Sequence, residues 1–404
     1  MAFSPKQIQI LLFPKSKYQA LICDGAVRSG KTAVMSLSFI LWAMHDFHDH
    51  NFAICGKSVQ SAVRNVIQPL LSIVYFRRYG YVLRYSVSNH CLTVMRGGKL
   101  NRFYIFGGKD ESSAALIQGM TLAGVLLDEV ALMPQSFVEQ ALARCSVENA
   151  RFWFNCNPDG PQHWFYREWI LNAEKHNALH LHFLMQDNPS LSDKTRERYE
   201  TQFTGVFYDR FIRGEWVVAE GLIYPEQAAG VGIVPNEPRE YEDYYISVDY
   251  GTLNPFSAGL WGLYKGCWYR FDEYRYSGRE EHANRTDEEY YTALEKLAGK
   301  RNIRRVIVDP SAASFMAVIE RHGRFIVRPA ANAVLDGIRM TATVFKQGKI
   351  KVCENCSGAV TEFKEYRWDE KSSEDKPVKE NDHAMDDIRY FVYTVLNGET
   401  FGFE

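Results

Sequence analysis

The sequence predicts an α/β protein of about two domains, and two observations support this prediction. Over residues 1–215, apolar strand-like runs alternate with helix-like stretches, which is typical of a mainly parallel sheet. Segment 216–243 is rich in Gly and Pro and then acidic, and after it the pattern changes to strands joined by tight turns. A chain of 404 residues is long enough for two such domains. We therefore predict domains at 1–215 and 244–404, with 216–243 as a linker.

The predicted strands of the first domain are short, largely apolar runs at 20–23, 52–55, 123–127, 151–158 and 179–184. A mostly apolar helix is predicted over 33–44 and an amphipathic helix over 58–75. Two further runs, 92–94 and 103–106, flank the turn sequence Arg96-Gly97-Gly98-Lys99. This arrangement predicts a β-hairpin.

The second domain begins with predicted strands at 244–249, 256–264 and 267–274, the last two joined by the Lys265-Gly266 turn. A helix follows over about 286–299, then a strand at 304–310, and then a helix, a strand and a helix up to about residue 352. The charged segment 369–380 is expected to be mobile. A closing helix over 382–396 would bury a stripe formed by Met385, Ile388, Val392 and Val395.

The composition is that of an ordinary soluble globular protein, with 46% hydrophobic and 24% charged residues. No apolar run reaches the ~18 residues of a membrane span, and the N-terminus lacks the layout of a signal peptide. Eight scattered cysteines suit a reduced cytosolic protein, and Cys353-x-x-Cys356 has no second pair at zinc spacing. The net charge of −2 means that any contact with DNA must come from local basic patches.

The segment Gly25–Thr32 (GAVRSGKT) matches the phosphate-binding P-loop, G-x-x-x-x-G-K-[ST]. It lies between a predicted strand and a predicted helix, so backbone N–H groups, including those of Ser29 and Gly30, would face an anion. Lys31 would reach the outer phosphates of a nucleotide, and the Thr32 hydroxyl would bind Mg²⁺. A second strand is followed by Gly56-Lys57-Ser58, but the required first glycine is absent there. That copy is not expected to bind nucleotide.

A second acidic strand end is consistent with nucleotide hydrolysis. The run Ala123–Leu127 ends in Asp128-Glu129, the layout in which the Asp holds Mg²⁺ and the Glu activates the attacking water. Asn155 or Asn157, at the end of another strand, could sense the γ-phosphate. Gln7, ahead of the P-loop, has an amide that can both donate to and accept from adenine. His180 and His182 share one face of a strand, and a half-exposed strand is the preferred interpretation over a metal site.

Three acids stand out in the second half: Asp249 and Asp309 at strand ends and Asp386 on the last helix. His383 shares a face of that helix with Asp386. Converging carboxylates form a site for one or two Mg²⁺ or Mn²⁺ ions, which can support phosphodiester hydrolysis. The alternative is that Asp is simply common at strand ends and helix starts. Spacing does not decide between Asp386 and Asp387, which lie on different faces of the helix.

Taken together, the chain resembles the large terminase subunit of tailed bacteriophages and prophages. The resemblance covers nearly the whole chain. Its marks, in chain order, are Pro5-Lys6-Gln7, Gly25–Thr32, Leu126–Glu129, Asn157-Pro158 with His163–Tyr166, Arg213–Trp216 with Glu220–Pro225, and Asp382–Tyr390. The P-loop is shared with many ATPases, whereas the ordered set is much more specific.

The resemblance implies an N-terminal P-loop ATPase of the RecA/ASCE type and a C-terminal nuclease of RNase H-like fold. Such a protein moves double-stranded DNA into a procapsid and cuts concatemeric DNA. It implies ATP with Mg²⁺ in the first domain and Mg²⁺ or Mn²⁺ in the second. The implied partners are double-stranded DNA, the small terminase subunit and the portal protein, in the host cytoplasm at the procapsid portal. A homo-oligomeric ring is implied for the active state, with a monomer as the alternative in solution.

Individual residues take roles from the same resemblance. Glu129 matches the catalytic acid, Gln7 the adenine-reading position, and Asn155 to Pro158 the segment that couples hydrolysis to DNA movement. Asp249, Asp309 and Asp386 match the nuclease metal ligands, with His383 beside them, although Asp387 occupies a position that is usually small in the family. Arg28 could stabilise transition-state charge in cis, and Arg144 is one candidate for a finger acting in trans.

The sequence is also compatible with two other functions. One is a P-loop DNA translocase or helicase that does not cut DNA. The other is an ATP-dependent clamp or assembly scaffold that uses the nucleotide only as a switch.

Overall fold

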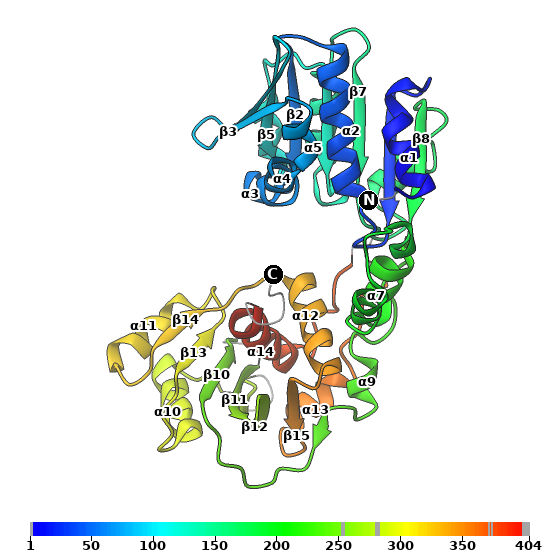
Figure 1. Ribbon diagram of the computed structural model, residues 1–404. Coiled ribbons are helices and arrows are strands. Elements are labelled where there is room, and N and C mark those ends of the chain that lie inside the picture. Colours follow the sequence, from blue (N-terminus) through cyan, green and yellow to red (C-terminus); the bar gives the residue numbers. More distant parts are fainter. Residues whose placement is uncertain (1–2, 252–254, 279–282, 371, 373–374, 398–404) are drawn as a thin grey trace. The chain divides into compact units, whose positions relative to one another are not determined.

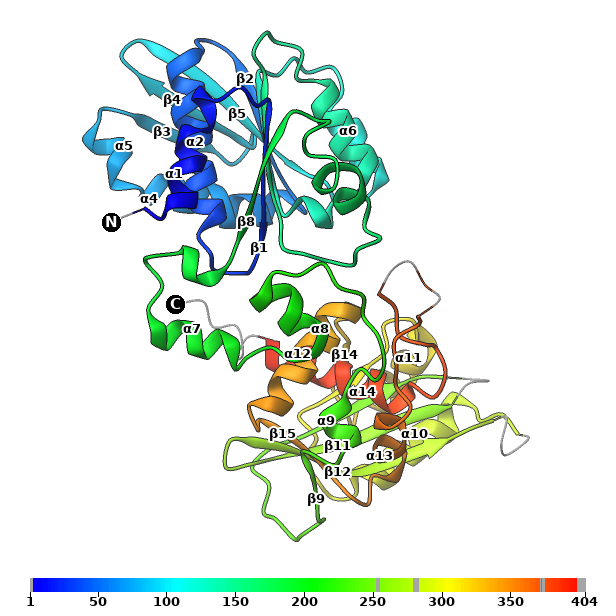
Figure 2. The ribbon, with the colours of Figure 1, turned by 90° about the vertical axis from the view of Figure 1, so that its right-hand side faces the viewer.

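The computed structural model describes residues 3–251, 255–278, 283–370, 372 and 375–397. The chain divides into two compact units (Figures 1 and 2). The first comprises Met1–Glu200 and Val206–Val218, and the second comprises Thr201–Gly205 and Ala219–Glu404. Among the described residues, no helix has both the length and the apolar character needed to cross a membrane.

The first unit is built on an eight-stranded sheet with the order β3-β4-β5-β2-β6-β7-β1-β8. Its strands are β1 Ala20–Gly25, β2 Asn51–Gly56, β3 Val82–Ser86, β4 Cys91–Arg96, β5 Lys99–Gly107, β6 Gly124–Asp128, β7 Arg151–Asn155 and β8 Ala178–Phe183. The six strands from β5 to β8 in this order run parallel, and β3 and β4 add an antiparallel edge. The parallel sheet and the β4–β5 hairpin are both confirmed. Because β6, β7 and β1 are parallel neighbours, their carboxyl ends meet at one edge.

Helices cover both faces of this sheet (Figure 2). On one face lie α1 (Pro5–Leu12) and α2 (Lys31–Asp46), and on the other lies α6 (Gln135–Ala143). Along β1, Leu21 and Cys23 belong to the core on the α2 side, whereas Ala20 and Ile22 belong to the core on the α6 side. Burial on both faces explains why the strand is a continuous apolar run and shows no alternation.

The helix predicted over 58–75 is present from Val59 to Ser72, but it is irregular and does not continue unbroken to Tyr75. The segment forms α3 (Val59–Ala62), a π-helical stretch η2 (Val63–Ile67) and α4 (Gln68–Ser72), and then a separate α5 (Val74–Arg78). Pro69 supplies no N–H to an α-helical hydrogen bond, which accounts for the irregular stretch before it. The break comes at Ile73, whose backbone is extended (φ −70°, ψ 110°).

The second unit contains a seven-stranded mixed sheet with the order β14-β13-β10-β11-β12-β15-β9. Its strands are β9 Ile233–Val234, β10 Tyr244–Asp249, β11 Phe256–Tyr264, β12 Cys267–Tyr276, β13 Arg305–Val308, β14 Val327–Pro329 and β15 Ile350–Cys353. The strand β11 runs antiparallel to both neighbours, while β13 and β14 continue parallel to β10. An antiparallel meander of three strands extended by parallel strands at β10 is the RNase H-like arrangement that the resemblance implies.

Two helical layers flank this sheet (Figure 1). The helices packed on it are α10 Asp287–Ala298, α11 Ala313–His322, α12 Val334–Lys346, α13 Ser357–Phe363 and α14 His383–Phe391, which continues as η8 Val392–Leu396. Ile246 and Val248 of β10 pack toward α10 and α11, and the alternating Ser247 and Asp249 face α14. The closing helix is confirmed, and it brings its acids onto the sheet face opposite α10 and α11.

The predicted linker 216–243 is largely part of the second unit. Within it, α9 (Pro225–Ala228) forms and β9 pairs in parallel with β15 at the sheet edge. Ile223 N donates to Tyr366 O over 2.9 Å, which attaches the start of the segment as well. The Gly and Pro content correctly indicated turns, but turns inside a domain have the same composition as a linker. The strand β15 is also absent from the prediction.

Candidate active sites

The P-loop connects β1 to α2 and has the backbone shape that its glycines permit. Gly25 has φ +114°, and a Cβ there would lie 2.1 Å from Phe183 O of β8. Gly30 caps α2 with φ 82°, and no side chain of the described residues hydrogen bonds to this helix start. Ala26 N and Val27 N donate to Phe183 O and Phe211 O over 2.8 and 2.9 Å, which fixes the start of the loop. The remaining N–H groups at the α2 N-terminus suit an anion.

Lys31 is only 5% exposed and is enclosed by the loop itself. Its Nζ donates to Gly25 O at 3.0 Å, Ala26 O at 2.7 Å and Asn157 Oδ1 at 3.3 Å. Burial lowers the pKa of this ammonium group. A buried cation held only by neutral oxygens would be stabilised by an anion, so this position favours phosphate binding.

Thr32, Asp128 and Asn155 meet at the carboxyl ends of β6 and β7. Thr32 Oγ1 donates to Asp128 Oδ1 over 3.2 Å, and Asn155 Nδ2 lies 2.7 Å from Thr32 Oγ1 and 2.6 Å from Asp128 Oδ1. Asp128 is 3% exposed, and burial raises its pKa. Asn155 Oδ1 is buried without a hydrogen-bond partner among the described residues. The adjacent Thr32 hydroxyl and Asp128 carboxylate are hard oxygen donors that fit the chemistry of Mg²⁺.

Two further predicted residues lie beside the loop. Glu129 follows Asp128 with a left-handed backbone (φ 58°), a conformation that is uncommon for a non-glycine residue. Gln7 is 4% exposed, and its Nε2 would lie 2.8 Å from a Cβ at Gly30. Its Oε1 accepts from Ser4 N over 3.2 Å, so the amide is oriented by the N-terminal cap of α1.

The two candidate arginines lie in different environments. Arg28, at φ 56° in the loop, donates from Nε to Tyr199 OH over 2.7 Å and stacks on that ring, at the end of α7 (Asp193–Glu200). Arg144 ends α6, and its backbone O accepts from Leu122 N just before β6 begins. The start of β6 is at the opposite sheet edge from the P-loop, so Arg144 is not positioned to act on a nucleotide of its own subunit.

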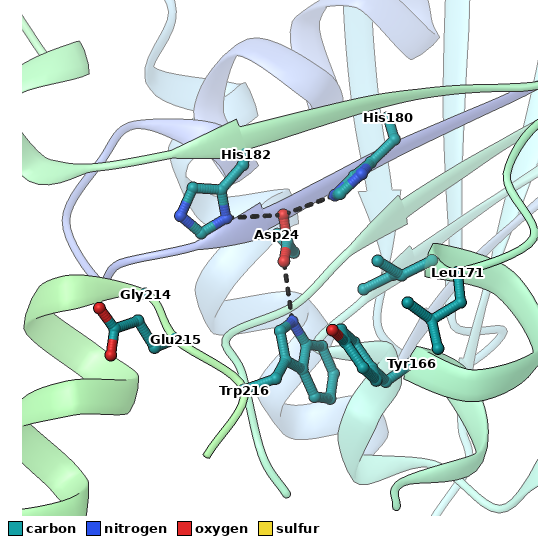
Figure 3. Close-up of a pocket in the computed structure, with 9 residues that line it drawn as sticks. Asp24, Tyr166, Leu171, His180, His182, Gly214, Glu215 and Trp216 are labelled. Atoms are coloured by element: carbon teal, nitrogen blue, oxygen red, sulfur yellow. Dashed lines mark hydrogen bonds and ion pairs between the residues drawn. The ribbon is translucent and has the colours of Figure 1, made fainter. Parts of the chain in front are cut away.

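A network around Asp24 adjoins the P-loop and was missed by the sequence prediction. Asp24 Oδ1 contacts His180 Nε2 at 2.8 Å and His182 Nδ1 at 3.1 Å, and Oδ2 accepts from Trp216 Nε1 at 2.8 Å (Figure 3). Burial would raise its pKa, but the hydrogen bonds from the two histidines hold the pKa well below its ordinary range. These residues line a pocket of about 510 Å³. The available signal was a carboxylate inside an otherwise apolar strand, next to the first P-loop glycine.

The acids of the second unit form a second candidate site. Asp249, at the end of β10, contacts His383 Nδ1 through Oδ2 at 2.8 Å, and Asp386 lies one helical turn further along α14. Burial, opposed by the His383 hydrogen bond and reinforced by repulsion from Asp386 and Asp309, raises the pKa of Asp249 to about 6. The negative charges of Asp386 and Asp309 thus disfavour ionisation of Asp249. Hard divalent cations suit the oxygen donors of such a cluster.

Asp386 and Asp387 point to different environments. Asp387 is fully buried and accepts from Arg270, from Ser247 at 2.9 Å and from Ser257 at 2.5 Å. Both of its oxygens are used in this internal network. Asp386, by contrast, is one of the acids whose negative charge raises the pKa of Asp249.

Glu362, on α13, is a second residue that the sequence did not indicate. It accepts from Ala384 N at 2.6 Å and Met385 N at 3.3 Å, at the start of α14. Arg275 Nη1 donates to it over 2.6 Å. Burial raises its pKa to about 7. A carboxylate at a helix N-terminus stabilises that end, so Glu362 orients the turn that carries His383 and Asp386.

In the described ranges, no three His, Cys, Asp or Glu side chains lie close enough to hold a metal ion as they stand. In the second unit, Asp249, Asp309 and Asp386 offer negatively charged oxygen donors of the kind that a divalent cation binds. His383 contacts Asp249. Cys353 and Cys356 are buried free thiols.

Comparison with known proteins gives a consistent result. A family model described as "terminase large subunit, T4likevirus-type, N-terminal" matches residues 22–229, about half of the chain. A crystal structure of the large terminase from a thermophilic bacteriophage is 50% identical, covers 98% of this chain and 100% of its own, and has a TM-score of 0.92. The same phage protein in complex with ADP is 48% identical, with a TM-score of 0.90. The large terminase subunit of Escherichia phage T5 is 24% identical over 294 residues, 68% of this chain and 66% of that protein. The chain belongs to the terminase large subunit family.

Proposed function

We propose that this protein is an ATP-driven motor that moves double-stranded viral DNA into a procapsid and cuts concatemeric DNA with a metal-dependent endonuclease. The P-loop and its surroundings carry the ATPase part of the proposal. They combine a buried Lys31, the Thr32–Asp128–Asn155 group and an adjacent Glu129 at one sheet edge.

In this proposal, Lys31 and the N–H groups from Ser29 to Thr32 bind the phosphates of ATP. Thr32 and Asp128 would hold Mg²⁺, which neutralises charge on the transferred phosphoryl group. Glu129 would orient and activate the attacking water. Gln7 would bind adenine through its Nε2, and Arg28, once released from Tyr199, would stabilise charge in cis. The complexes of the thermophilic-phage relative with ADP and with ATP-γ-S support nucleotide binding at this fold.

The nuclease part assigns Asp249, Asp309 and Asp386 as ligands for Mg²⁺ or Mn²⁺. The metal would supply an activated water and stabilise the leaving oxygen. His383 holds Asp249 in place over 2.8 Å, and Glu362 and Arg389 fix the helix and the side chain that present Asp386. This assignment is favoured by the 2.8 Å contact between Asp249 and His383 on the helix that carries Asp386, and by the raised pKa of Asp249 beside Asp386 and Asp309.

The proposed partners follow from family membership. They are double-stranded DNA, the small terminase subunit and the portal protein, with the active form a homo-oligomeric ring at the portal in the host cytoplasm.

Plasmid cleavage tests the nuclease assignment against the translocase that does not cut DNA. Wild-type protein should nick and linearise supercoiled plasmid with Mn²⁺, and Asp249→Ala should lose this activity by at least about 100-fold, because an essential carboxylate is removed. Asp336→Ala removes an acid of α12, bonded to Arg339, and should cleave normally. Full cleavage by Asp249→Ala would reject the site. Absence of cleavage in the wild type would favour the translocase.

Steady-state ATP hydrolysis separates the motor from a nucleotide-switched scaffold. Glu129→Gln should retain ATP binding and lose turnover, since the general base is removed while the loop is unchanged. A scaffold would hydrolyse no ATP beyond a single turnover in either protein.

A further inference from the structure

One lysine occupies the outer side of the proposed nuclease acid cluster. Lys379 Nζ lies 3.1 Å from Asp386 Oδ2 and 3.1 Å from Asp382 Oδ2. Both carboxylates are largely buried, at 7% and 4% exposed. The ammonium therefore neutralises a carboxylate that the proposed function assigns to a metal ion.

The backbone before Lys379 is held in place. Val378 N donates to Arg367 O over 2.9 Å, and Asp369 N donates to Lys376 O over 2.8 Å. Pro377 forms an antiparallel bridge with Trp368. Residues 371, 373 and 374 of the segment 369–380, which the sequence predicts to be mobile, lie outside the described part. The paired residues present Lys379 at a defined place beside α14.

Asp386 forms ion pairs with Lys379 and Arg389, and these two cations differ in how easily they can move away. Arg389 donates to Asp386 Oδ1 from Nε at 3.2 Å and from Nη2 at 2.9 Å, and to Asn332 Oδ1 at 2.9 Å. Its side chain is 2% exposed, whereas that of Lys379 is 61% exposed. Arg389 is thus fixed on Oδ1, and Oδ2 is the oxygen from which a flexible, hydrated cation can withdraw.

We propose that Lys379 is a tethered cation that competes with the divalent metal for Asp386 and thereby sets the metal concentration at which the nuclease becomes active. This inference rests on the proposed nuclease site. A metal ion and the ammonium both need Oδ2, so each excludes the other from this oxygen. Binding of one must weaken the apparent binding of the other by the same factor.

The expected size of the effect is moderate. A half-exposed ion pair changes an equilibrium only several-fold. Lys379→Met should therefore bind Mn²⁺ about three- to ten-fold more tightly than the wild type. Lys379→Arg keeps the charge and should show no such gain. Lys364→Met removes an exposed charge at the end of α13 and should match the wild type.

The test is a titration of the full-length proteins with Mn²⁺, followed by electron paramagnetic resonance of the free ion. The Mn²⁺ concentration for half-maximal plasmid cleavage should fall by the same factor in Lys379→Met. Thermal unfolding without metal verifies that each variant is folded. Equal or weaker Mn²⁺ binding by folded Lys379→Met would overturn the inference.

Asp249→Ala separates this inference from the proposed function. If the wild type binds Mn²⁺ and Asp249→Ala does not, the acid site stands, whatever Lys379→Met does. If Asp249→Ala binds Mn²⁺ as the wild type does, the proposed site itself is wrong, and the inference fails with it.

Discussion

Two loops of the first unit connect a buried parallel strand to a helix and contain the sequence Gly-Lys followed by Thr or Ser, but they are built differently. In the P-loop, Gly30 starts α2 without a side-chain cap from the described residues, and Lys31 is buried among loop carbonyls. In the loop after β2, Lys57 is exposed and Ser58 caps α3.

The difference lies in which groups satisfy the N–H donors of the helix start. Ser61 N donates to Ser58 Oγ at 3.0 Å, and Ser58 N donates to Ser61 Oγ at 2.9 Å. This capping box uses the donors that an anion would need. The sequence Gly-Lys-Ser/Thr therefore marks a phosphate site only when the N–H groups of the helix start are left for the ligand. The following variants test this contrast.

Replacement of the two lysines should give the largest difference. Lys31→Ala should lower kcat/KM for ATP hydrolysis by at least about 100-fold, because a buried cation facing the phosphates is lost. Lys57→Ala should retain wild-type hydrolysis, since its ammonium group is exposed in a loop that caps itself. If a coupled phosphate-release assay showed the same loss of ATP hydrolysis in both variants, the two loops would not differ in nucleotide binding.

Substitution of the strand residue that precedes each loop should give the second-largest difference. Asp24→Asn should lower the free energy of unfolding of the first unit by about 2 kcal/mol, because hydrogen bonds to a buried carboxylate are weakened. The folded-state pKa of Asp24 lies below its unfolded value, so this stabilisation is present above the unfolded pKa and is lost as pH falls through the folded pKa.

Urea unfolding at pH 7 and pH 5 measures this contribution. Both pH values lie above the unfolded pKa of about 3.9, so Asp24 is ionised at both and the difference between wild type and Asp24→Asn should persist at pH 5. A difference that vanishes at pH 5 would contradict the assigned pKa direction. Cys55→Ser, next to last in β2 as Asp24 is in β1, changes a buried thiol and leaves the Asp24 network intact.

Removal of the Ser58 side chain that caps α3 should have the smallest effect among these variants. Ser58→Ala should destabilise the first unit by about 1 kcal/mol, the usual cost of a lost N-cap. ATP hydrolysis by the folded protein should be unchanged. A loss of hydrolysis larger than about three-fold would show that the second loop takes part in nucleotide chemistry.

The sequence was informative where a function depends on neighbours along the chain. The P-loop, the Asp128-Glu129 strand end and the closing helix could all be predicted because their residues are adjacent or one helical turn apart. The ends of β10 and β13 could be recognised as acidic for the same reason. Asp249 and Asp386 were grouped only as candidates, and their electrostatic contact required the tertiary structure.

The residues that were missed depend on partners distant in sequence. Asp24 acquires its role from His180 and Trp216, and Glu362 acquires its role by meeting the start of α14. Nothing near Lys379 in the sequence distinguishes it from an ordinary solvated lysine. The strand β9 has two residues and is recognisable only through its pairing with β15. Spatial pairing of this kind leaves no local periodicity.

That short strand has a practical consequence for work on the nuclease alone. A fragment that starts at Tyr244, the first residue of β10, would lack Ile233-Val234 and leave the backbone N–H and C=O groups of β15 open at the sheet edge. Exposed edges of this kind invite pairing between molecules and hence aggregation. Poor solubility of such a fragment would therefore reflect the chosen truncation point, and a fragment starting at Ala219 would keep the edge covered.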